Sequence, residues 1–105
     1  MMQTVAKTPA PPYYAVIFSS IRTDGDNGYG DAAKRMVELA SSQPGFLGFE
    51  SVRQEIGISV SYWASLEAIQ SWKENAEHRE VQKKAKVWYS SFRVRVCRVE
   101  KEYGF

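Results

Sequence analysis

Apolar residues follow two kinds of pattern along this chain, one typical of strands and one typical of helices. Short runs rich in aromatic and β-branched residues predict strands over residues 13–22, 46–54, 58–64 and 92–103. Only Glu55-Ile56-Gly57 separates the second run from the third, so these two strands are predicted to form an antiparallel hairpin. The first eleven residues are polar, rich in Ala and Pro and without periodicity, and residues 1–11 are predicted to be a flexible tail.

In two stretches between these strands, apolar residues recur every three or four positions, which is the spacing of one helix face. The first stretch spans residues 31–42, and Asn27 or Asp31 is the candidate N-cap at its start. The second stretch begins after Ser65, a good N-cap residue, and continues to residue 89 with a predicted break at Asn75.

The predicted order of elements is β-α-β-β-α-β, which is the pattern of ferredoxin-like folds. We therefore expect an α+β domain over residues 12–105, with an antiparallel sheet and both helices on one of its faces. The pattern leaves open which face of the third strand meets the helices. Either Trp63 and its alternate neighbours do so, or the set Ile58, Val60 and Tyr62 does.

The sheet face that the helices leave uncovered is also expected to be apolar. The first and second strands carry large apolar residues on both faces, whereas a half-exposed sheet alternates more cleanly. An extensive apolar surface on a soluble protein marks an interface. We therefore predict a homodimer in which two sheets pair through these faces.

The composition excludes several classes of partner. The chain has 14 Lys and Arg against 12 Asp and Glu, and the short cluster KKAK at 83–86 is interpreted as a solvated helix face, so no nucleic-acid partner is expected. No apolar run approaches the roughly 18 residues that cross a membrane, and the N-terminal residues lack the apolar centre of a signal peptide. No membrane partner is expected, and the protein is predicted to be cytoplasmic. One cysteine, Cys97, excludes an intramolecular disulfide, and with one histidine it does not suffice for a protein-only zinc site.

Three short motifs resemble a known family: QPGFLGFES at 43–51, the pattern YWxSLEAIxxW at 62–72, and EHxxxQ at 77–82 followed by Trp88-Tyr89. They resemble the antibiotic biosynthesis monooxygenase (ABM) superfamily, and more narrowly its small bacterial members that are grouped with haem-degrading monooxygenases. The resemblance covers about residues 13–103. It implies a dimeric α/β barrel, in which two ferredoxin-like subunits pair their sheets.

Members of this family with known activity oxidise polycyclic aromatic molecules with O₂ and no cofactor, or bind haem and cleave it. The resemblance therefore implies a monooxygenase that acts without a cofactor on a flat hydrophobic small molecule. Haem bound through His78 and a non-enzymatic dimeric binding protein are the two alternatives. The haem-degrading members use an Asn on the first strand, a Trp on the second helix and a His ten residues after that Trp. Trp72 matches the Trp, but Gln82 stands at the position of the His, and the first strand has Ser19 and Ser20 but no Asn.

Six residues are the candidates for the site. His78 is the candidate acid/base, because a histidine titrates near neutral pH. Trp63 and Trp72 are expected to shape an aromatic pocket, with plain core packing as the alternative. On the first strand, Ser19, Ser20 and Arg22 are the candidates for binding substrate.

Arginines are frequent on the predicted strands and at their ends. We expect them to pair with carboxylates across the sheet, and binding of an anionic group is the alternative. The arginines concerned are Arg22, Arg53, Arg93, Arg95 and Arg98, and the candidate carboxylates are Glu50, Glu100 and Glu102.

Overall fold

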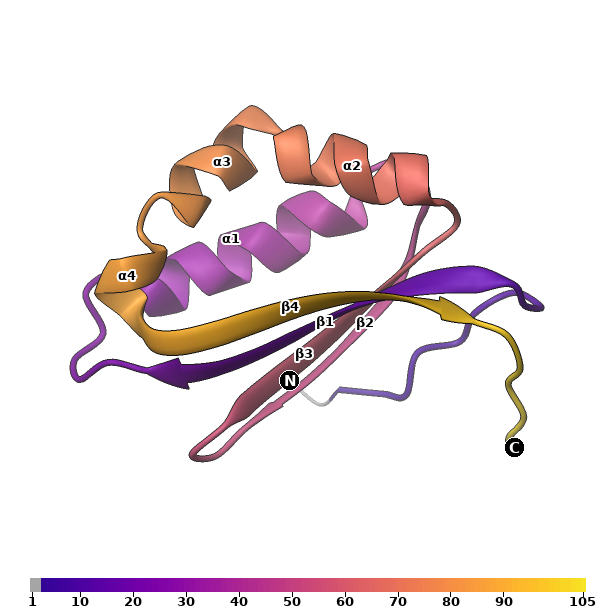
Figure 1. The fold of residues 1–105 in the computed structure, drawn as a ribbon, viewed down its shortest axis with the longest axis horizontal. Coiled ribbons are helices and arrows are strands. Elements are labelled where there is room, and N and C mark those ends of the chain that lie inside the picture. Colours follow the sequence, from indigo (N-terminus) through magenta and orange to yellow (C-terminus); the bar gives the residue numbers. More distant parts are fainter. Residues whose placement is uncertain (1–2) are drawn as a thin grey trace.

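A computed structural model describes residues 3–105 and shows one four-stranded sheet with all the helices on one side of it (Figure 1). The elements follow in the order β1 (Tyr13–Arg22), α1 (Tyr29–Ser41), β2 (Phe46–Arg53), β3 (Gly57–Trp63), α2 (Leu66–Glu74), α3 (Ala76–Gln82), α4 (Ala85–Trp88) and β4 (Tyr89–Val99). The strand order in the sheet is β2-β3-β1-β4, and all neighbours are antiparallel. The predicted ferredoxin-like fold is confirmed, as an open sheet.

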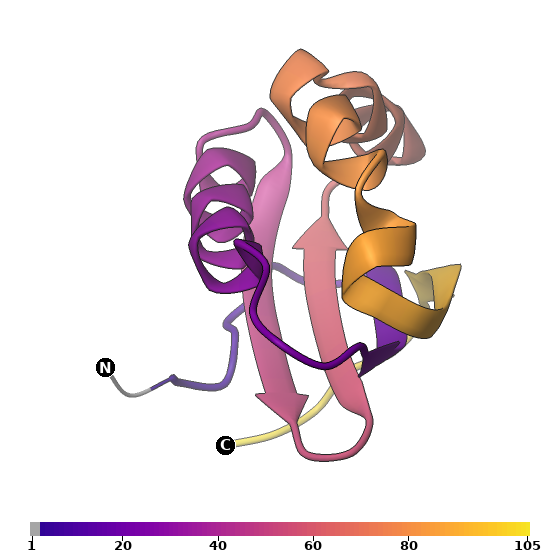
Figure 2. The ribbon, with the colours of Figure 1, turned by 90° about the vertical axis from the view of Figure 1, so that its left-hand side faces the viewer.

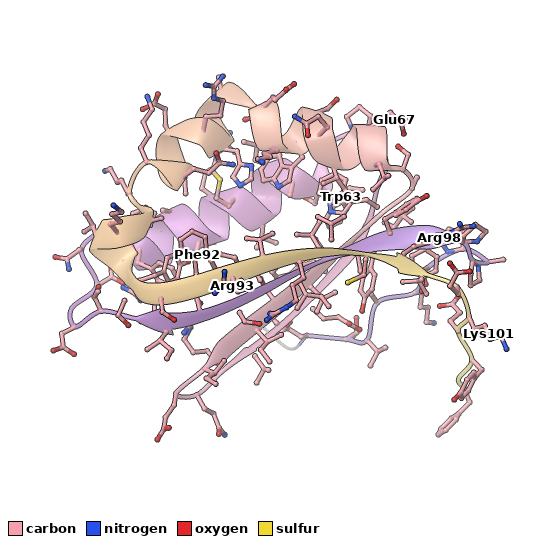
Figure 3. All side chains as sticks on the ribbon, in the orientation of Figure 1. Trp63, Glu67, Phe92, Arg93, Arg98 and Lys101 are labelled. Carbon is pink, nitrogen blue, oxygen red and sulfur yellow. The ribbon has the colours of Figure 1, made fainter. Side chains whose placement is uncertain are left out.

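The register of the sheet decides which face meets the helices. Trp63 is fully buried and lies between the sheet and the helices (Figure 3). Residues at alternate positions of a strand share a face, so Ser59 and Ser61 lie on the helix side with Trp63. The set Ile58, Val60 and Tyr62 faces away from the helices, and Ile58 is 42% exposed.

The start of α1 differs from the prediction. Its N-cap is Gly28, with φ 84°, and neither Asn27 nor Asp31 caps the helix. Asn27 itself has a positive φ of 51°, and Asp31 already lies in the first turn. The carboxylate of Asp26 serves instead, because it accepts from the N–H groups of Gly28 (3.0 Å) and Gly30 (3.1 Å).

The second helical stretch is divided into three helices. Ser65 caps α2 by accepting from the N–H of Ala68 at 3.0 Å, as predicted. The predicted break at Asn75 is confirmed, and a second break follows at residues 83–84, before α4. The last strand starts at Tyr89 rather than at residue 92, and it ends at Val99 rather than at 103. Within residues 3–105, no helix is both long and apolar enough to cross a membrane.

The two edges of the sheet differ in what lies beside them. The N-terminal segment, predicted to be a flexible tail, runs near β2 in this structure (Figure 2). The side chain of Gln3 bonds both the N–H and the carbonyl of Ser51, and the N–H of Ala6 donates to Glu50 at 2.9 Å. Along β4 the apolar side chains on the helix side are about half exposed: Phe92, Val94 and Val96. The β4 edge is therefore open, whereas the chain itself covers part of the β2 edge.

Candidate functional site

Three rings from the sheet and two helices form a stack, which we call the histidine stack (Trp63, Trp72, His78). The Trp63 and Trp72 rings lie 6.2 Å apart between centroids with an interplanar angle of 23°. His78 lies 4.1 Å from Trp72 at an angle of 12°. The indole N–H of Trp63 donates to Ser61 Oγ at 2.9 Å. The structure thus brings together the three candidate catalytic residues.

The break at Asn75 is what brings His78 onto Trp72. In a continuous helix, residues six positions apart would be about 9 Å apart along the axis. Here Asn75 is extended, with ψ 130°, and its Oδ1 accepts from the N–H groups of Glu77 (3.0 Å) and His78 (3.1 Å). The sequence indicated the break but not this consequence. An Asn followed two residues later by an acidic residue is the local signal for a new helix start.

The hydrogen bonds of His78 fix where its proton lies. Its Nδ1 is 2.9 Å from the carbonyl oxygen of Trp72, and a carbonyl only accepts, so Nδ1 carries the hydrogen and Nε2 keeps a lone pair. Gln82 Nε2 is also 3.4 Å from Nδ1, but the shorter contact with Trp72 decides the tautomer. Within residues 3–105, Nε2 has no hydrogen-bond partner, yet it is not sealed from solvent.

The environment of His78 keeps the ring neutral. Burial lowers the pKa of His78 below its ordinary value of 6.5, because desolvation disfavours the charged imidazolium. The hydrogen bond to the Trp72 carbonyl opposes this shift and is the smaller effect. At neutral pH the side chain therefore offers an unprotonated nitrogen that can accept a proton.

The three candidates for binding substrate lie elsewhere. Ser20 is buried, and it accepts from Arg53 Nη2 at 2.5 Å on the helix side of β1. Ser19 lies on the other face, opposite Arg93. Ser20 is six positions along β1 from the residue opposite Trp63, which is about 20 Å. The structure therefore does not bring the serines to the histidine stack.

Arg22 is held by a second group of rings, which we call the tyrosine cluster (Arg22, Tyr29, Trp88, Tyr89). Its Nε donates to the Trp88 carbonyl at 2.9 Å, and its Nη2 donates to the Gly25 carbonyl at 3.2 Å. The guanidinium also lies 3.6 Å from the centroid of the Tyr29 ring. Two nitrogens and one face of this guanidinium are thus used by the protein itself.

The predicted pairing of strand arginines with carboxylates is mostly wrong. Arg98 does contact Glu100, at 3.3 Å. Glu50, however, accepts from the hydroxyl of Tyr62 at 2.6 Å, and Glu102 accepts from the hydroxyl of Tyr13 at 2.7 Å. These two carboxylates thus bond tyrosine hydroxyls, and within residues 3–105 no salt bridge joins Arg93 or Arg95 to a carboxylate.

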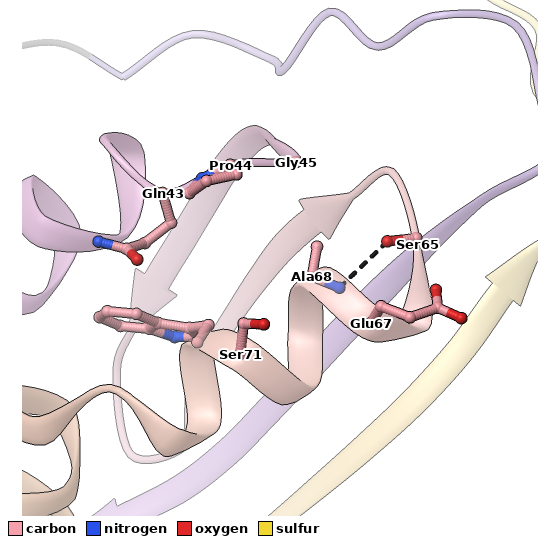
Figure 4. A pocket seen from close by; sticks show the side chains of 8 residues that line it. Gln43, Pro44, Gly45, Ser65, Glu67, Ala68 and Ser71 are labelled. Carbon is pink, nitrogen blue, oxygen red and sulfur yellow. Dashed lines mark hydrogen bonds between the residues drawn. The ribbon is translucent and has the colours of Figure 1, made fainter.

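Two hollows on the surface of residues 3–105 are lined by candidate residues, and His78 lines neither. The smaller has a volume of about 290 Å³ and lies between the turn after α1 and the helix α2 (Figure 4). Trp72 lines it together with small and polar residues, among them Gln43, Ser65 and Ser71. The larger, of about 460 Å³, lies where β1 ends and β4 begins.

These hollows bear on the metal and haem alternatives. A haem iron ligand must face a space that holds the macrocycle, and neither hollow places such a space at His78. Neither of these hollows therefore supports a haem at this ring. Within residues 3–105, no group of three or more His, Cys, Asp and Glu side chains is placed to hold a metal ion.

A ferredoxin-like domain can carry many unrelated activities, so this fold defines an architecture and not one activity. Residues 12–84 match the family model described as antibiotic biosynthesis monooxygenase. The protein YqjZ of Bacillus subtilis (strain 168), itself uncharacterized, is 53% identical over 108 residues, covering 100% of this chain and 95% of YqjZ. This chain belongs to the antibiotic biosynthesis monooxygenase family.

Solved structures agree on the fold. SnoaB, a cofactor-independent oxygenase from Streptomyces nogalater, matches with a TM-score of 0.76 over 88% of this chain and 97% of SnoaB, at 8% identity. Protein SO0527 from Shewanella oneidensis also matches with a TM-score of 0.76, over 93% of this chain and all of that one, at 10% identity. At such low identity the likeness concerns the fold alone.

Proposed function

We propose that this protein is an ABM-type monooxygenase that oxidises a flat, electron-rich aromatic molecule with O₂ and without a cofactor. One observation carries the proposal: the Nδ1–H of His78 is donated to the Trp72 carbonyl, which leaves a neutral Nε2 that has no partner within residues 3–105, on a ring stacked against Trp72. Membership of the family and the fold shared with SnoaB, a cofactor-independent oxygenase, support it.

The proposed chemistry begins with a proton transfer. Nε2 of His78 removes a proton from an acidic C–H or O–H of the substrate, and the resulting anion gives electrons to O₂. For a ring CH₂ group, the balance is CH₂ + O₂ → C=O + H₂O. One oxygen atom enters the substrate and the other leaves as water. The substrate supplies all four electrons, so no external reductant is needed.

The surroundings of His78 support an apolar, flat substrate. Trp72 belongs both to the histidine stack and to the lining of the smaller hollow. Ligand pockets are mostly apolar with a few placed polar groups, and the mixture of an indole ring with Gln43, Ser65 and Ser71 has this character. Trp72 would then form the apolar wall, with Trp63 behind it in the core, and His78, stacked on Trp72, would supply the base.

We also propose that the working form is a homodimer. The sheet face away from the helices carries exposed apolar side chains: Ile21 (44%), Val52 (66%) and Ile58 (42%). Pairing of two such faces across a two-fold axis would remove them from water. Ile58→Arg should then shift the protein toward the monomer in analytical ultracentrifugation, and an unchanged sedimentation coefficient would contradict the proposal.

The oxygenase proposal is tested by oxygen uptake. Anthrone, a flat tricyclic molecule with an acidic CH₂ group, is added to the purified protein and consumption of O₂ is followed with an electrode. We expect His78→Gln to lower the catalysed rate by about 100-fold, the contribution typical of a general base. Arg79→Gln, at the exposed neighbouring position, is the control and should keep the rate.

Two results would overturn this assignment. Absence of uptake above the uncatalysed rate, for anthrone and for related hydroxylated tricyclic compounds, would remove the oxygenase proposal. A rate that survives His78→Gln would leave an oxygenase but remove His78 as its base.

A further inference from the structure

The side of the sheet away from the helices, which we call the outer face, has two unlike halves. Near the start of β1 its side chains are buried: Tyr13 is 4% exposed and Ala15 is 5% exposed. Toward the hairpin between β2 and β3 they are open to solvent, as Val52 and Ile58 show. All four residues share one face of the sheet, so the contrast comes from what lies on that face.

Residues 3–10, which we call the N-terminal strap, lie against the buried half (Figure 1). The N–H of Ala6 donates to Glu50 Oε2 at 2.9 Å. Two residues further on, the hydroxyl of Thr8 donates to the hydroxyl of Tyr13 at 2.9 Å. The strap is therefore attached to β2 and to β1, in addition to its contacts at the β2 edge.

The carboxylate of Glu50 is shared between the strap and the sheet. While Oε2 accepts from Ala6, Oε1 accepts from the hydroxyl of Tyr62 at 2.6 Å. Burial, and then the hydrogen bond to Glu50, raises the pKa of Tyr62 to about 12, so this hydroxyl keeps the hydrogen that it donates. A carboxylate accepts at both oxygens, and this one carboxylate therefore joins the strap to the tyrosine on which the strap lies.

Gly48 provides the space into which the strap fits. A Cβ at this position would lie 2.9 Å from the Cβ of Ala6, which is too close, and 3.7 Å from the ring of Tyr62, which is ordinary contact. The φ of Gly48 is not in the left-handed region, so the backbone itself accepts other residues. Glycine is needed at position 48 for the close approach of the strap.

We propose that the N-terminal strap weakens and confines self-association, because it covers half of the face through which a second copy of this chain pairs. The proposal rests on the homodimer proposed above, whose apolar residues Ile21, Val52 and Ile58 remain exposed beside the strap. Under the strap lie Tyr13 and Tyr62, whose rings pack edge-on with centroids 6.0 Å apart. Without the strap, these rings would extend the apolar surface, and a larger apolar surface on each partner strengthens association.

The test compares the full chain with a variant that lacks residues 3–10, by sedimentation velocity over a dilution series. We expect the concentration at which half of the chains are associated to fall by at least about tenfold in the variant. If the wild-type dimer is too tight to dissociate, the same comparison is made in the Ile58→Arg background. Cooperative urea unfolding checks that the variant is folded.

The outcomes separate the strap from the homodimer. A half-association concentration that is unchanged or higher without residues 3–10 would overturn the role of the strap. A wild type that stays monomeric at every concentration, beside a variant that associates, would remove the homodimer and support the strap as a barrier to association.

Gly48→Ala and a compensating variant test the strap through a single methyl group, with residues 3–10 present. Gly48→Ala should release the strap, so the heteronuclear NOE of residues 3–10 should fall and association should become stronger, as in the deletion. Ala6→Gly combined with Gly48→Ala removes the clashing Cβ and leaves the Cα of residue 6 at 3.9 Å, so both values should return to those of the wild type.

Three results of this pair would each overturn the proposal. The first is a strap that stays ordered in Gly48→Ala, and the second is a strap that is released without stronger association. The third is a combined variant that behaves like Gly48→Ala alone, because the effect would then come from position 48 in the sheet and not from its contact with the strap.

Discussion

The histidine stack and the tyrosine cluster are both built from rings on the helix side of the sheet, but they differ in how their polar atoms are used. In the tyrosine cluster, Arg22 donates to backbone carbonyls and the indole N–H of Trp88 donates to the Asn27 carbonyl at 2.9 Å. In the histidine stack, the indole of Trp63 and Nδ1 of His78 are bonded, but Nε2 of His78 has no partner among the described residues.

The difference separates a structural use of aromatic residues from a chemical one. A group of rings whose polar atoms are satisfied internally contributes packing energy and holds the chain in place. A basic nitrogen that reaches solvent without a protein partner can act on a bound molecule. Substitutions in the tyrosine cluster should therefore lower the free energy of unfolding. Substitutions around His78 should instead change the pKa of its ring.

The largest effect is expected from Trp88→Ala. Trp88 is 3% exposed and packs edge-on against Tyr29, with ring centroids 5.9 Å apart. Its removal leaves a cavity and should lower the free energy of unfolding by about 3–5 kcal/mol, measured by urea denaturation. The neighbouring Val87→Ala is the control, because Val87 is 54% exposed and its loss should cost about 0.5 kcal/mol or less. Equal effects of the two substitutions would contradict a structural role for the cluster.

Asn75→Ala should have a smaller effect on stability and a specific effect on His78. Loss of the cap that accepts from Glu77 and His78 should cost about 1 kcal/mol. It should also loosen the ring from Trp72 and let the pKa of His78 rise toward 6.5. His78 is the single histidine, so its ring gives one unambiguous NMR signal in a pH titration.

Ser65→Ala provides the matched comparison, because Ser65 caps α2 as Asn75 caps α3. It should cost a similar free energy of unfolding and leave the pKa of His78 where it was. If both variants shift that pKa equally, the effect is general loosening, and Asn75 has no special part in placing the ring.

The smallest expected effect is a dependence of stability on pH. The pKa of His78 is lower in the folded chain than in the unfolded chain, so below about pH 6.5 the unfolded chain binds more protons. The stability that comes from neutral His78 is therefore present above that pH and is lost as the pH falls. Denaturation of wild type and His78→Gln at about pH 7 and about pH 5 should show a steeper loss in the wild type. Parallel losses would mean that burial does not disfavour the charged ring.

Local patterns were enough to predict the elements and their order. The strand runs and the spacing of apolar residues lead to the ferredoxin-like fold, and Ser65 and Asn75 were recognised as helix boundaries because a capping side chain acts within three residues. The cap of α1 was missed because Asp26 caps it from outside the helix while Asn27 adopts a positive φ. The arginine pairs were missed because Tyr13 and Tyr62, distant in sequence, occupy the carboxylates.

The sequence by itself determined the four strands, the two helical stretches, the fold class and which side chains have the chemistry to act, because these depend on residue type and on spacing over a few positions. Only the tertiary structure decided that Trp63, rather than Ile58, faces the helices, and that His78 lies on Trp72 while Ser20 lies at the other end of β1. In the part of the chain that the structure describes, it also left Arg93 and Arg95 without a salt bridge to a carboxylate. Such relations depend on strand register and on contacts between distant segments. The extended backbone at Asn75, for example, ends α2 and sets the direction in which α3 begins.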